Sequence, residues 1–412
     1  MAAGTARRRW FWAVYAVLLA GLTLACMEAA ASFLVPSWPA RDIRPIAVTS
    51  TPTITYNDWA LRDRPRTFPW PPGVRFRSVL VGDSFLEGAF VRAPLSAFVE
   101  QRWTDAGHTG MEAINFGVSA TGPPQYYYRI RDVALRLEPD VILLAVYAGN
   151  DFLAEPYGRW IPPAIAELPL PSLLGAVAPR STWFVVNRLG LSEFGGANKP
   201  IEGEFEQLNA WLELPPAERL DRLAGHMHRH YFPKLPEATI REILSRGGER
   251  FWAAFDKRRK DPEFLAGWLL SGMIDWETGT WTMPRDAAEA DRLDGRRMVD
   301  ETLSWLVAAH RLAAANGVRL IVALIPVGTV DPDYVDFWRP WPKYFSTSLS
   351  ADARHRALAA ALGRSSVPFI DLRDVLAGRR GTYRIADGHW TERGTEIVAD
   401  RVARELLKLA PN

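Results

Sequence analysis

The sequence predicts an α/β protein, a three-layer α/β/α sandwich with a five-stranded parallel sheet, plus a mostly helical insertion and an N-terminal transmembrane helix. Apolar runs rich in Val, Ile and Leu alternate with amphipathic helical stretches, as in strands joined by crossover helices. The run at 140–147 is apolar on both faces, which is typical of a central parallel strand covered by helices. Right-handed crossovers then place helices on both faces of the sheet.

The alternation of strands and helices gives each element in turn. Strands are expected at 75–81, 112–116, 140–147, 319–325 and 367–372. Helices are expected at 94–106, 125–137, 297–316, 351–362 and 392–409. Between Phe152 and Arg296 the alternation stops, which indicates an insertion into the sandwich.

The chain divides into five predicted segments. Residues 1–35 are a cytoplasmic tip and a transmembrane signal-anchor, and residues 36–73 are a proline-rich stalk and approach segment. The sandwich comprises 74–151 and 297–412, and the Trp-rich, mostly helical insertion spans 152–296. Eight prolines in 36–73 oppose a regular helix and favour extended chain.

The N-terminus has the pattern of a membrane anchor. Three arginines, 7–9, precede 18 uncharged residues from Trp10 to Met27, which span about 27 Å as a helix. The arginines favour a cytoplasmic amino end, so the body is expected in the periplasm or at the cell exterior. Cleavage at Ala29–Ala31 would make the segment a signal peptide instead, although its length favours an uncleaved anchor. Lipidation of Cys26 is disfavoured because Thr23 stands where a branched apolar residue is expected.

Composition excludes several classes of protein. The 412 residues carry 49 basic and 47 acidic side chains, a net charge of +2, so no strong field favours nucleic acid. The single cysteine excludes an internal disulfide framework and a multi-cysteine metal site. Nucleic acid is therefore not an expected partner.

Polar residues follow the predicted strands at their carboxyl ends. Ser84 follows the strand that ends at Gly82, where the chain turns into a helix, and Asn150 follows the strand at 140–147. Asp387 and His389 lie between the last strand and the last helix. The carboxyl ends of parallel strands meet at one edge of the sheet, where open α/β sheets place their chemistry. For Ser84 alone, a role as a helix cap is the alternative.

These side chains suit acyl transfer. His389 can take the proton of the Ser84 hydroxyl, and Asp387 can orient the imidazole. The Asn150 amide and the main-chain N–H groups of Gly117 and Ser84 are candidate oxyanion donors. This chemistry requires no metal or organic cofactor.

Four short blocks resemble those of the SGNH (GDSL-type) hydrolase superfamily. They are Gly82–Ser84, Asn115–Gly117, Gly149–Asp151 and Asp387–His389, in the order usual for that family. Upstream, Asn57–Asp63 resembles an approach segment of membrane-anchored bacterial members, with alanine where glycine is usual. The resemblance implies a flavodoxin-like sheet and esterase, lipase or acyltransferase chemistry. Asp83 and Trp390, next to Ser84 and His389, are further candidates for substrate contact, with packing as the alternative for Trp390.

Two departures leave the reaction open. A single residue separates Asp387 from His389, and Trp390 and Thr391 follow, as in exported polysaccharide O-acetyltransferases related to alginate acetylation. In those proteins this block precedes the serine block, whereas here it comes last. The second departure is the insertion, which matches no pattern of the family.

The expected function is that of an exported serine esterase that removes or transfers O-acetyl groups on a carbohydrate. A polysaccharide O-acetyltransferase with the same triad, working with envelope polysaccharide machinery, is one alternative. A non-catalytic glycan-binding or assembly protein and a lipid esterase are the others.

Other clusters have simpler explanations. The tryptophans of the insertion suit a helical core more readily than a glycan-facing lid. His226, His228 and His230 lack an acidic residue at zinc-protease spacing. Asp331, Asp333 and Asp336 lack the Gly and Glu of a calcium loop. No metal site is therefore expected.

Overall fold

A computed structural model describes most of the chain, which forms two units. The described residues are 2–34, 57, 59, 61–88, 90–119, 121–152, 181, 203–256, 269–279, 284–295, 299–385 and 388–410. Residues 1–44 and 157–200 form the first unit, and residues 45–156 and 201–412 form the second. The sheet and all the site residues discussed below belong to the second unit.

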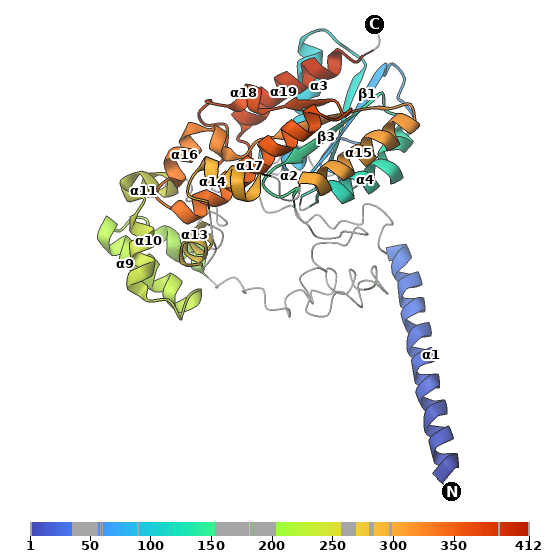
Figure 1. Ribbon diagram of the computed structural model, residues 1–412, viewed down its shortest axis with the longest axis horizontal. Coiled ribbons are helices and arrows are strands. Elements are labelled where there is room, and N and C mark those ends of the chain that lie inside the picture. The colour runs from blue at the N-terminus through green and yellow to red at the C-terminus, as the bar shows by residue number, and fades with distance from the viewer. Residues whose placement is uncertain are drawn as a thin grey trace. The chain divides into compact units, whose positions relative to one another are not determined.

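The second unit is built on a five-stranded parallel sheet (Figure 1). Its strands are β1 (Phe76–Gly82), β2 (Met111–Gly117), β3 (Val141–Tyr147), β4 (Arg319–Ile325) and β5 (Phe369–Asp371), in the order β2-β1-β3-β4-β5. All four pairings are parallel, and Gly82 lies beside Gly117 at the carboxyl ends of β1 and β2. The predicted α/β sandwich with its five parallel strands is confirmed.

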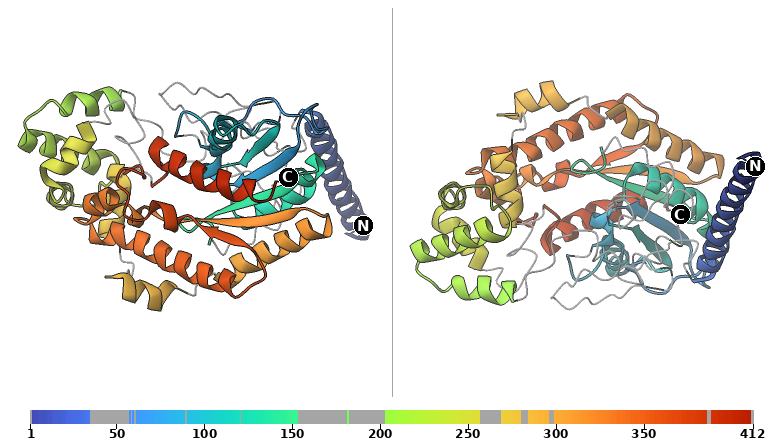
Figure 2. Two further views of the ribbon diagram at one scale, coloured as in Figure 1. Left: turned by 90° about the horizontal axis from the view of Figure 1, so that it is seen from above. Right: turned by 90° about the horizontal axis from the view of Figure 1, so that it is seen from below.

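Helices cover both faces of this sheet (Figure 2). On one face, α3 (Leu95–Asp105) packs against α19 (Glu392–Leu407), and the Trp103 indole N–H donates to the Ala403 carbonyl at 3.0 Å. On the other face lie α4 (Pro123–Asp132), α15 (Val299–Ala315) and α17 (Pro342–Gly363). Strands β1, β2 and β3 are buried along nearly their whole length, which explains their apolar runs.

Two helices differ from their predicted bounds. The helix expected at 125–137 ends at Asp132 and is followed by a 3₁₀ turn, η1 (Ala134–Leu137). The helix expected at 351–362 begins nine residues earlier, at Pro342, where proline suits the first turn. Ser346 and Thr347 there donate side-chain hydrogen bonds to carbonyls three residues back. Such polar residues hide the apolar helical period from the sequence.

The described part of the insertion is mostly helical. It contains α8 (Glu204–Trp211), α9 (Pro216–His230), α10 (Glu237–Ser245), α11 (Gly248–Asp256), α13 (Leu269–Thr278) and α14 (Ala287–Asp294). Two hydrogen bonds fasten it to α17: the Trp341 indole donates to the Ile243 carbonyl at 2.9 Å, and Glu277 accepts from the Lys343 N–H at 3.0 Å. Trp252 is buried in the resulting core, as the packing interpretation expects. Four other insertion tryptophans, at 160, 183, 268 and 281, lie outside the described residues.

Part of the range 36–73 packs against the edge of the sheet. Arg62, Asp63 and Arg66 are buried, although all three are charged. The Asp63 carboxylate accepts from the Arg66 guanidinium at 2.9 and 3.0 Å and from the Asn115 N–H at 2.8 Å. These bonds join the approach segment to the end of β2.

In the first unit, α1 (Ala2–Leu34) contains one apolar stretch, Trp10–Ala31, with a mean hydropathy of 1.9. Among the described residues it is the one helix long and apolar enough to cross a membrane.

Candidate active site

The serine at the end of β1 contacts the histidine near the C-terminus. His389 Nε2 lies 2.7 Å from Ser84 Oγ, although the two residues are 305 positions apart. Ser84 opens α2 (Ser84–Glu87), and Asp83 caps this helix by accepting from the Phe85 N–H at 3.0 Å. Gly82 is needed at the turn because a Cβ there would lie 2.9 Å from Leu86 Cγ. The pair has the geometry of a hydroxyl and its general base.

The loop that carries His389 is held by its own backbone and by Asp331. The His389 carbonyl accepts from the Arg384 N–H at 2.7 Å, and Tyr383 forms an antiparallel bridge with Trp390. Gly388, before His389, has a φ of 72°, a conformation that glycine adopts easily. The buried Asp331 carboxylate accepts from the N–H groups of Thr382 and Tyr383 at 2.7 and 3.0 Å. Asp331 is therefore part of the support of the histidine loop.

Asp387, predicted to orient His389, lies outside the described residues. Its assignment remains a prediction from the sequence.

Asn150 joins the site through Asp83. Its amide Nδ2 lies 3.3 Å from Asp83 Oδ2, and both residues are within one turn of a strand end. Burial raises the pKa of Asp83, and the Phe85 N–H and the nearby His389 oppose that rise. Asp83 is 1% exposed, and each of its carboxylate oxygens accepts a hydrogen bond within the protein. The Asp83 carboxylate is thus in a place to position Ser84 and Asn150, and its contact with substrate stays a prediction.

The predicted oxyanion role of Gly117 stays a prediction. Its N–H donates to Asn115 Oδ1 at 2.9 Å, so it already has a partner. A Cβ on Gly117 would lie 2.1 Å from the Glu87 nitrogen, which means that glycine is required for β2 to pack on α2. The next two N–H groups are also engaged, that of Val118 by the Gly82 carbonyl and that of Ser119 by the Glu87 carboxylate.

Three buried ionisable residues beneath the site were given no role in the sequence analysis. Arg129 donates to the carbonyls of Gly82 and Phe116 at 3.0 and 2.9 Å and so ties the ends of β1 and β2 together. Glu87 accepts from both the N–H and the hydroxyl of Ser119. Asp151 accepts from the Tyr147 N–H at 2.7 Å and from the Tyr126 hydroxyl at 2.9 Å. The sequence feature that could have identified Asp151 is its position next to Asn150, directly after a strand.

Burial raises the pKa of Asp151 well above its usual range, and the negative charge of Asp83 adds to the rise. The Tyr147 N–H and the Tyr126 hydroxyl act in the opposite direction. Burial wins, because the carboxyl has no access to water. Asp151 is therefore protonated over a pH range in which an ordinary aspartate is ionised.

A small pocket opens beside the Ser84–His389 pair. It is lined by Ser84, Phe85, Gly88, Phe90, Val91, His389, Trp390 and Thr395. The space open to a water-sized sphere is about 10 Å³, close to the room for one water molecule. The Phe90 ring centre lies 4.6 Å from that of His389, and the Phe85 ring centre lies 4.8 Å from it.

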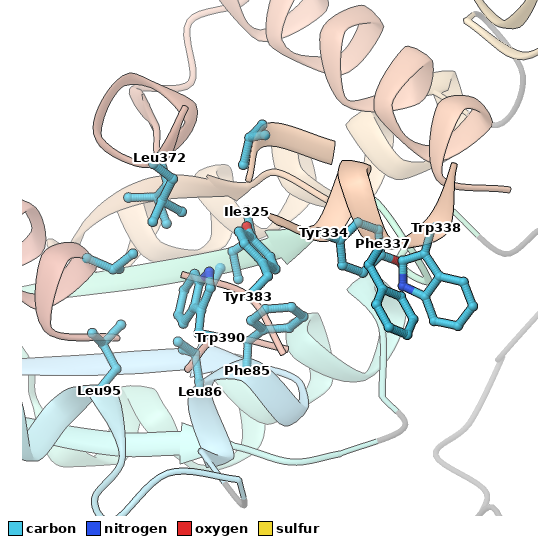
Figure 3. Packing of buried hydrophobic residues seen from close by; sticks show 14 of the residues in the cluster. Phe85, Leu86, Leu95, Ile325, Tyr334, Phe337, Trp338, Leu372, Tyr383 and Trp390 are labelled. Atoms are coloured by element: carbon cyan, nitrogen blue, oxygen red, sulfur yellow. The ribbon is translucent and has the colours of Figure 1, made fainter. Parts of the chain in front are cut away.

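Trp390 both lines this pocket and belongs to the core. It is 2% exposed, and its ring meets Phe85 edge-on at 4.9 Å. Figure 3 shows Phe85, Tyr383 and Trp390 gathered in one buried cluster. Trp390 thus belongs both to the buried core and to the pocket lining, and its contact with substrate stays a prediction.

The histidine cluster of the insertion has protein partners. His226 Nε2 lies 2.5 Å from Glu204 Oε1, and the Tyr231 hydroxyl donates to the same carboxylate at 2.8 Å. Within the described ranges, no group of three or more His, Cys, Asp or Glu side chains is arranged to hold a metal ion.

Comparisons with known proteins relate the chain to acyl-transfer enzymes. Residues 281–412 match the model of the family described as SGNH hydrolase-like domain, acetyltransferase AlgX. This range contains His389 but not Ser84, so the match to the family says nothing about the serine. A search of curated proteins gave no match.

Two solved structures that match this chain at low similarity are described as lipases or acylhydrolases. A GDSL-like lipase from Bacteroides thetaiotaomicron is 14% identical, with 82% of this chain and 92% of that chain covered and a TM-score of 0.33. The lipase/acylhydrolase from Enterococcus faecalis is 12% identical, with 80% and 95% covered and a TM-score of 0.32. The family model confirms the resemblance predicted from the motifs: the C-terminal part of this chain is similar to the SGNH hydrolase-like domain of AlgX acetyltransferases.

Proposed function

We propose that the protein is a serine-dependent enzyme of the SGNH type that removes or transfers O-acetyl groups on a carbohydrate. The observation that carries this proposal is the 2.7 Å contact between Ser84 Oγ and His389 Nε2 at the carboxyl edge of a parallel sheet. A binding protein has no need to hold a serine hydroxyl against an imidazole in this way, so an enzyme is favoured over a non-catalytic module.

The proposed reaction proceeds in two steps. Ser84 Oγ attacks the acyl carbonyl while His389 Nε2 takes the hydroxyl proton, and the protonated His389 then donates that proton to the departing sugar oxygen. The acyl group is now an ester of Ser84. His389 next takes a proton from the acceptor, which attacks the acyl-enzyme, and returns it to Ser84. In this proposal Asp387 orients His389.

Two donors are proposed for the oxyanion. An amide nitrogen carries two hydrogens, so Asn150 Nδ2 can donate to Asp83 and to an oxyanion together. The main-chain N–H of Ser84 is the second donor, at the start of α2. Gly117 is not included, because its N–H is bonded to Asn115.

The small pocket supports an acetyl group as the transferred acyl chain. A narrow pocket walled by Phe90, Val91 and Trp390, with room for about one water molecule, suits a small acyl group such as acetyl. The similarity of 281–412 to an acetyltransferase domain supports a carbohydrate hydroxyl as acceptor alongside water. A membrane-anchored protein with its body outside the cytoplasm is proposed from the apolar α1 and its preceding arginines.

The experiment that tests this proposal uses the full chain in mild detergent and a fluorophosphonate probe. Intact mass should show one adduct on the wild type and none on Ser84→Ala, with turnover of acetyl esters lost in the variant and its circular dichroism unchanged. Labelling or turnover that survives in folded Ser84→Ala would refute Ser84 as the nucleophile. Purified acetylated and deacetylated glycans then separate the two acceptors, because a transferase moves the acyl group to a sugar faster than to water.

A further inference from the structure

We infer that Arg62, in the approach segment, is a positioning residue that sets the size of the acyl group reaching Ser84. Its guanidinium holds the backbone at Glu87, Val91 and Arg92, where the wall of the pocket is built. The inference rests on the proposed function and extends it to the specificity of the same site.

Arg62 is almost completely buried and bonds to main-chain carbonyls. Its side chain Nη2 donates to the Val91 carbonyl at 2.7 Å and to that of Arg92 at 3.3 Å, and Nη1 reaches the Glu87 carbonyl at 3.5 Å. The planar guanidinium fits several acceptors in fixed directions, which a lysine ammonium does not. Hydrogen bonds from a charged donor are also stronger than neutral ones. Arg62 therefore holds the main chain at Glu87, Val91 and Arg92.

This stretch of backbone forms one wall of the acyl pocket. Phe90 and Val91 line the pocket with Ser84 and His389, and the Phe90 ring lies against the imidazole. Gly88 begins the stretch with a φ of 67°, and a Cβ there would lie 2.9 Å from Pro94 Cα. Because Phe90 and Val91 line the pocket, a shift of their backbone would change the room beside Ser84.

The approach segment is itself anchored to a rigid element. The Arg62 carbonyl accepts from Asn115 Nδ2 at 2.9 Å, and the neighbouring Asp63 carboxylate accepts from the Asn115 N–H at 2.8 Å. Asn115 lies in the buried strand β2, beside β1. Arg62 therefore connects the pocket wall to the sheet that also positions Ser84.

A second set of contacts to this backbone, made by the Arg92 side chain, is weaker than that of Arg62. Arg92 pairs with Glu392 at 2.9 Å and with Glu396 at 3.2 Å on α19, but these side chains are 57%, 43% and 38% exposed. Exposed ion pairs contribute little because water screens them and the side chains lose freedom. The buried Arg62 is expected to dominate the position of the wall.

The test measures acyl-size selectivity in the full chain in detergent. For the wild type and for Arg62→Gln and Arg62→Lys, kcat/KM is measured with p-nitrophenyl acetate and with p-nitrophenyl butyrate. A tight apolar pocket discriminates one methylene by about 10-fold or more, so the acetate-to-butyrate ratio should fall at least about 10-fold in Arg62→Gln. Arg62→Lys, which keeps the charge but not the fork, should fall between. Val91→Ala, which widens the wall directly, should lower the ratio in the same direction.

Two controls separate positioning from loss of stability. Arg64→Gln changes an arginine two residues away whose side chain is 50% exposed, and it should leave the ratio unchanged. Arg77→Gln removes a buried partner of Glu112 at the far end of β1 and should lower stability without changing the ratio. If the Gln variant of Arg62 does not fold, the Lys variant decides the question.

An unchanged ratio in folded Arg62 variants, or an equal change in Arg77→Gln, would overturn the inference. The proposed function would be refuted by a different result: no ester turnover and no Ser84-dependent adduct in the wild type.

Discussion

Replacing Arg66 by glutamine tests whether the approach segment is an integral part of the folded domain. The Arg66 side chain is 1% exposed and donates to Asp63 at 2.9 and 3.0 Å, to Glu100 at 2.8 Å and to the Ala113 carbonyl at 2.9 Å. Its removal leaves the Asp63 carboxylate, 5% exposed, without its cation. Breaking a buried pair from one side costs about 3–5 kcal/mol. Glutamine can keep one of these hydrogen bonds, so the lower end of this range, about 3 kcal/mol, is expected.

The assay is guanidinium denaturation of the full chain in detergent, followed by tryptophan fluorescence. Arg64→Gln is the matched control from the same segment, because Arg64 is 50% exposed and pairs with Glu100 at 3.2 Å and with Glu112 at 3.3 Å. Ion pairs of an exposed arginine are worth about 0–1 kcal/mol each, and Glu112 keeps Arg66 and Arg77 as partners, so this variant should lose less stability than Arg66→Gln. If Arg66→Gln loses no more stability than Arg64→Gln, residues 61–66 do not stabilise the domain and the reasoning is wrong.

Three more predictions concern the site and the insertion. Asn150→Ala should lower kcat for acetyl esters by about 10²–10³-fold with a smaller change in KM, and a KM effect alone would contradict the oxyanion role. Because the pKa of Asp151 is raised in the folded chain, the folded state binds more protons than the unfolded state above pH 4 or so, and unfolding free energy falls as pH rises. In Asp151→Asn, the unfolding free energy measured by denaturation should fall less between pH 4 and 7 than in the wild type. Equal slopes in the two proteins would refute this prediction. Gly247→Ala should cost about 1–3 kcal/mol, since its Cβ would lie 2.3 Å from the Trp341 ring, whereas Gly363→Ala, with open space, should not destabilise in the same denaturation assay.

The strands and the nucleophile turn could be predicted from local pattern. The expected strand at 319–325 has the observed bounds, and 140–147 differs from β3 by one residue, because buried parallel strands require continuous apolar runs. The turn at Ser84 could also be predicted, since a β-run that stops at glycine before a helix is a local signal. Helix bounds were less accurate where side chains bond to their own backbone, as at the start of α17.

The roles of Gly117 and Asp83 could not be predicted from local pattern. Both stand at strand ends, where catalytic groups gather, yet their polar atoms bond to Asn115, Phe85 and Asn150. Motif position tells which edge of the sheet a residue occupies. It does not tell which neighbouring atom takes its hydrogen bond.

Local periodicity and turn chemistry in the chain thus determine the strands, the helices and the edge at which Ser84 and His389 meet. Tertiary structure alone decides that Arg62 reaches the carbonyls of Val91 and Arg92 and that Arg129 joins the ends of β1 and β2. The physical reason is that these bonds connect main-chain carbonyls, which every residue carries. Their pairing depends on which strand and loop ends the fold brings together, and no residue type in the sequence records it.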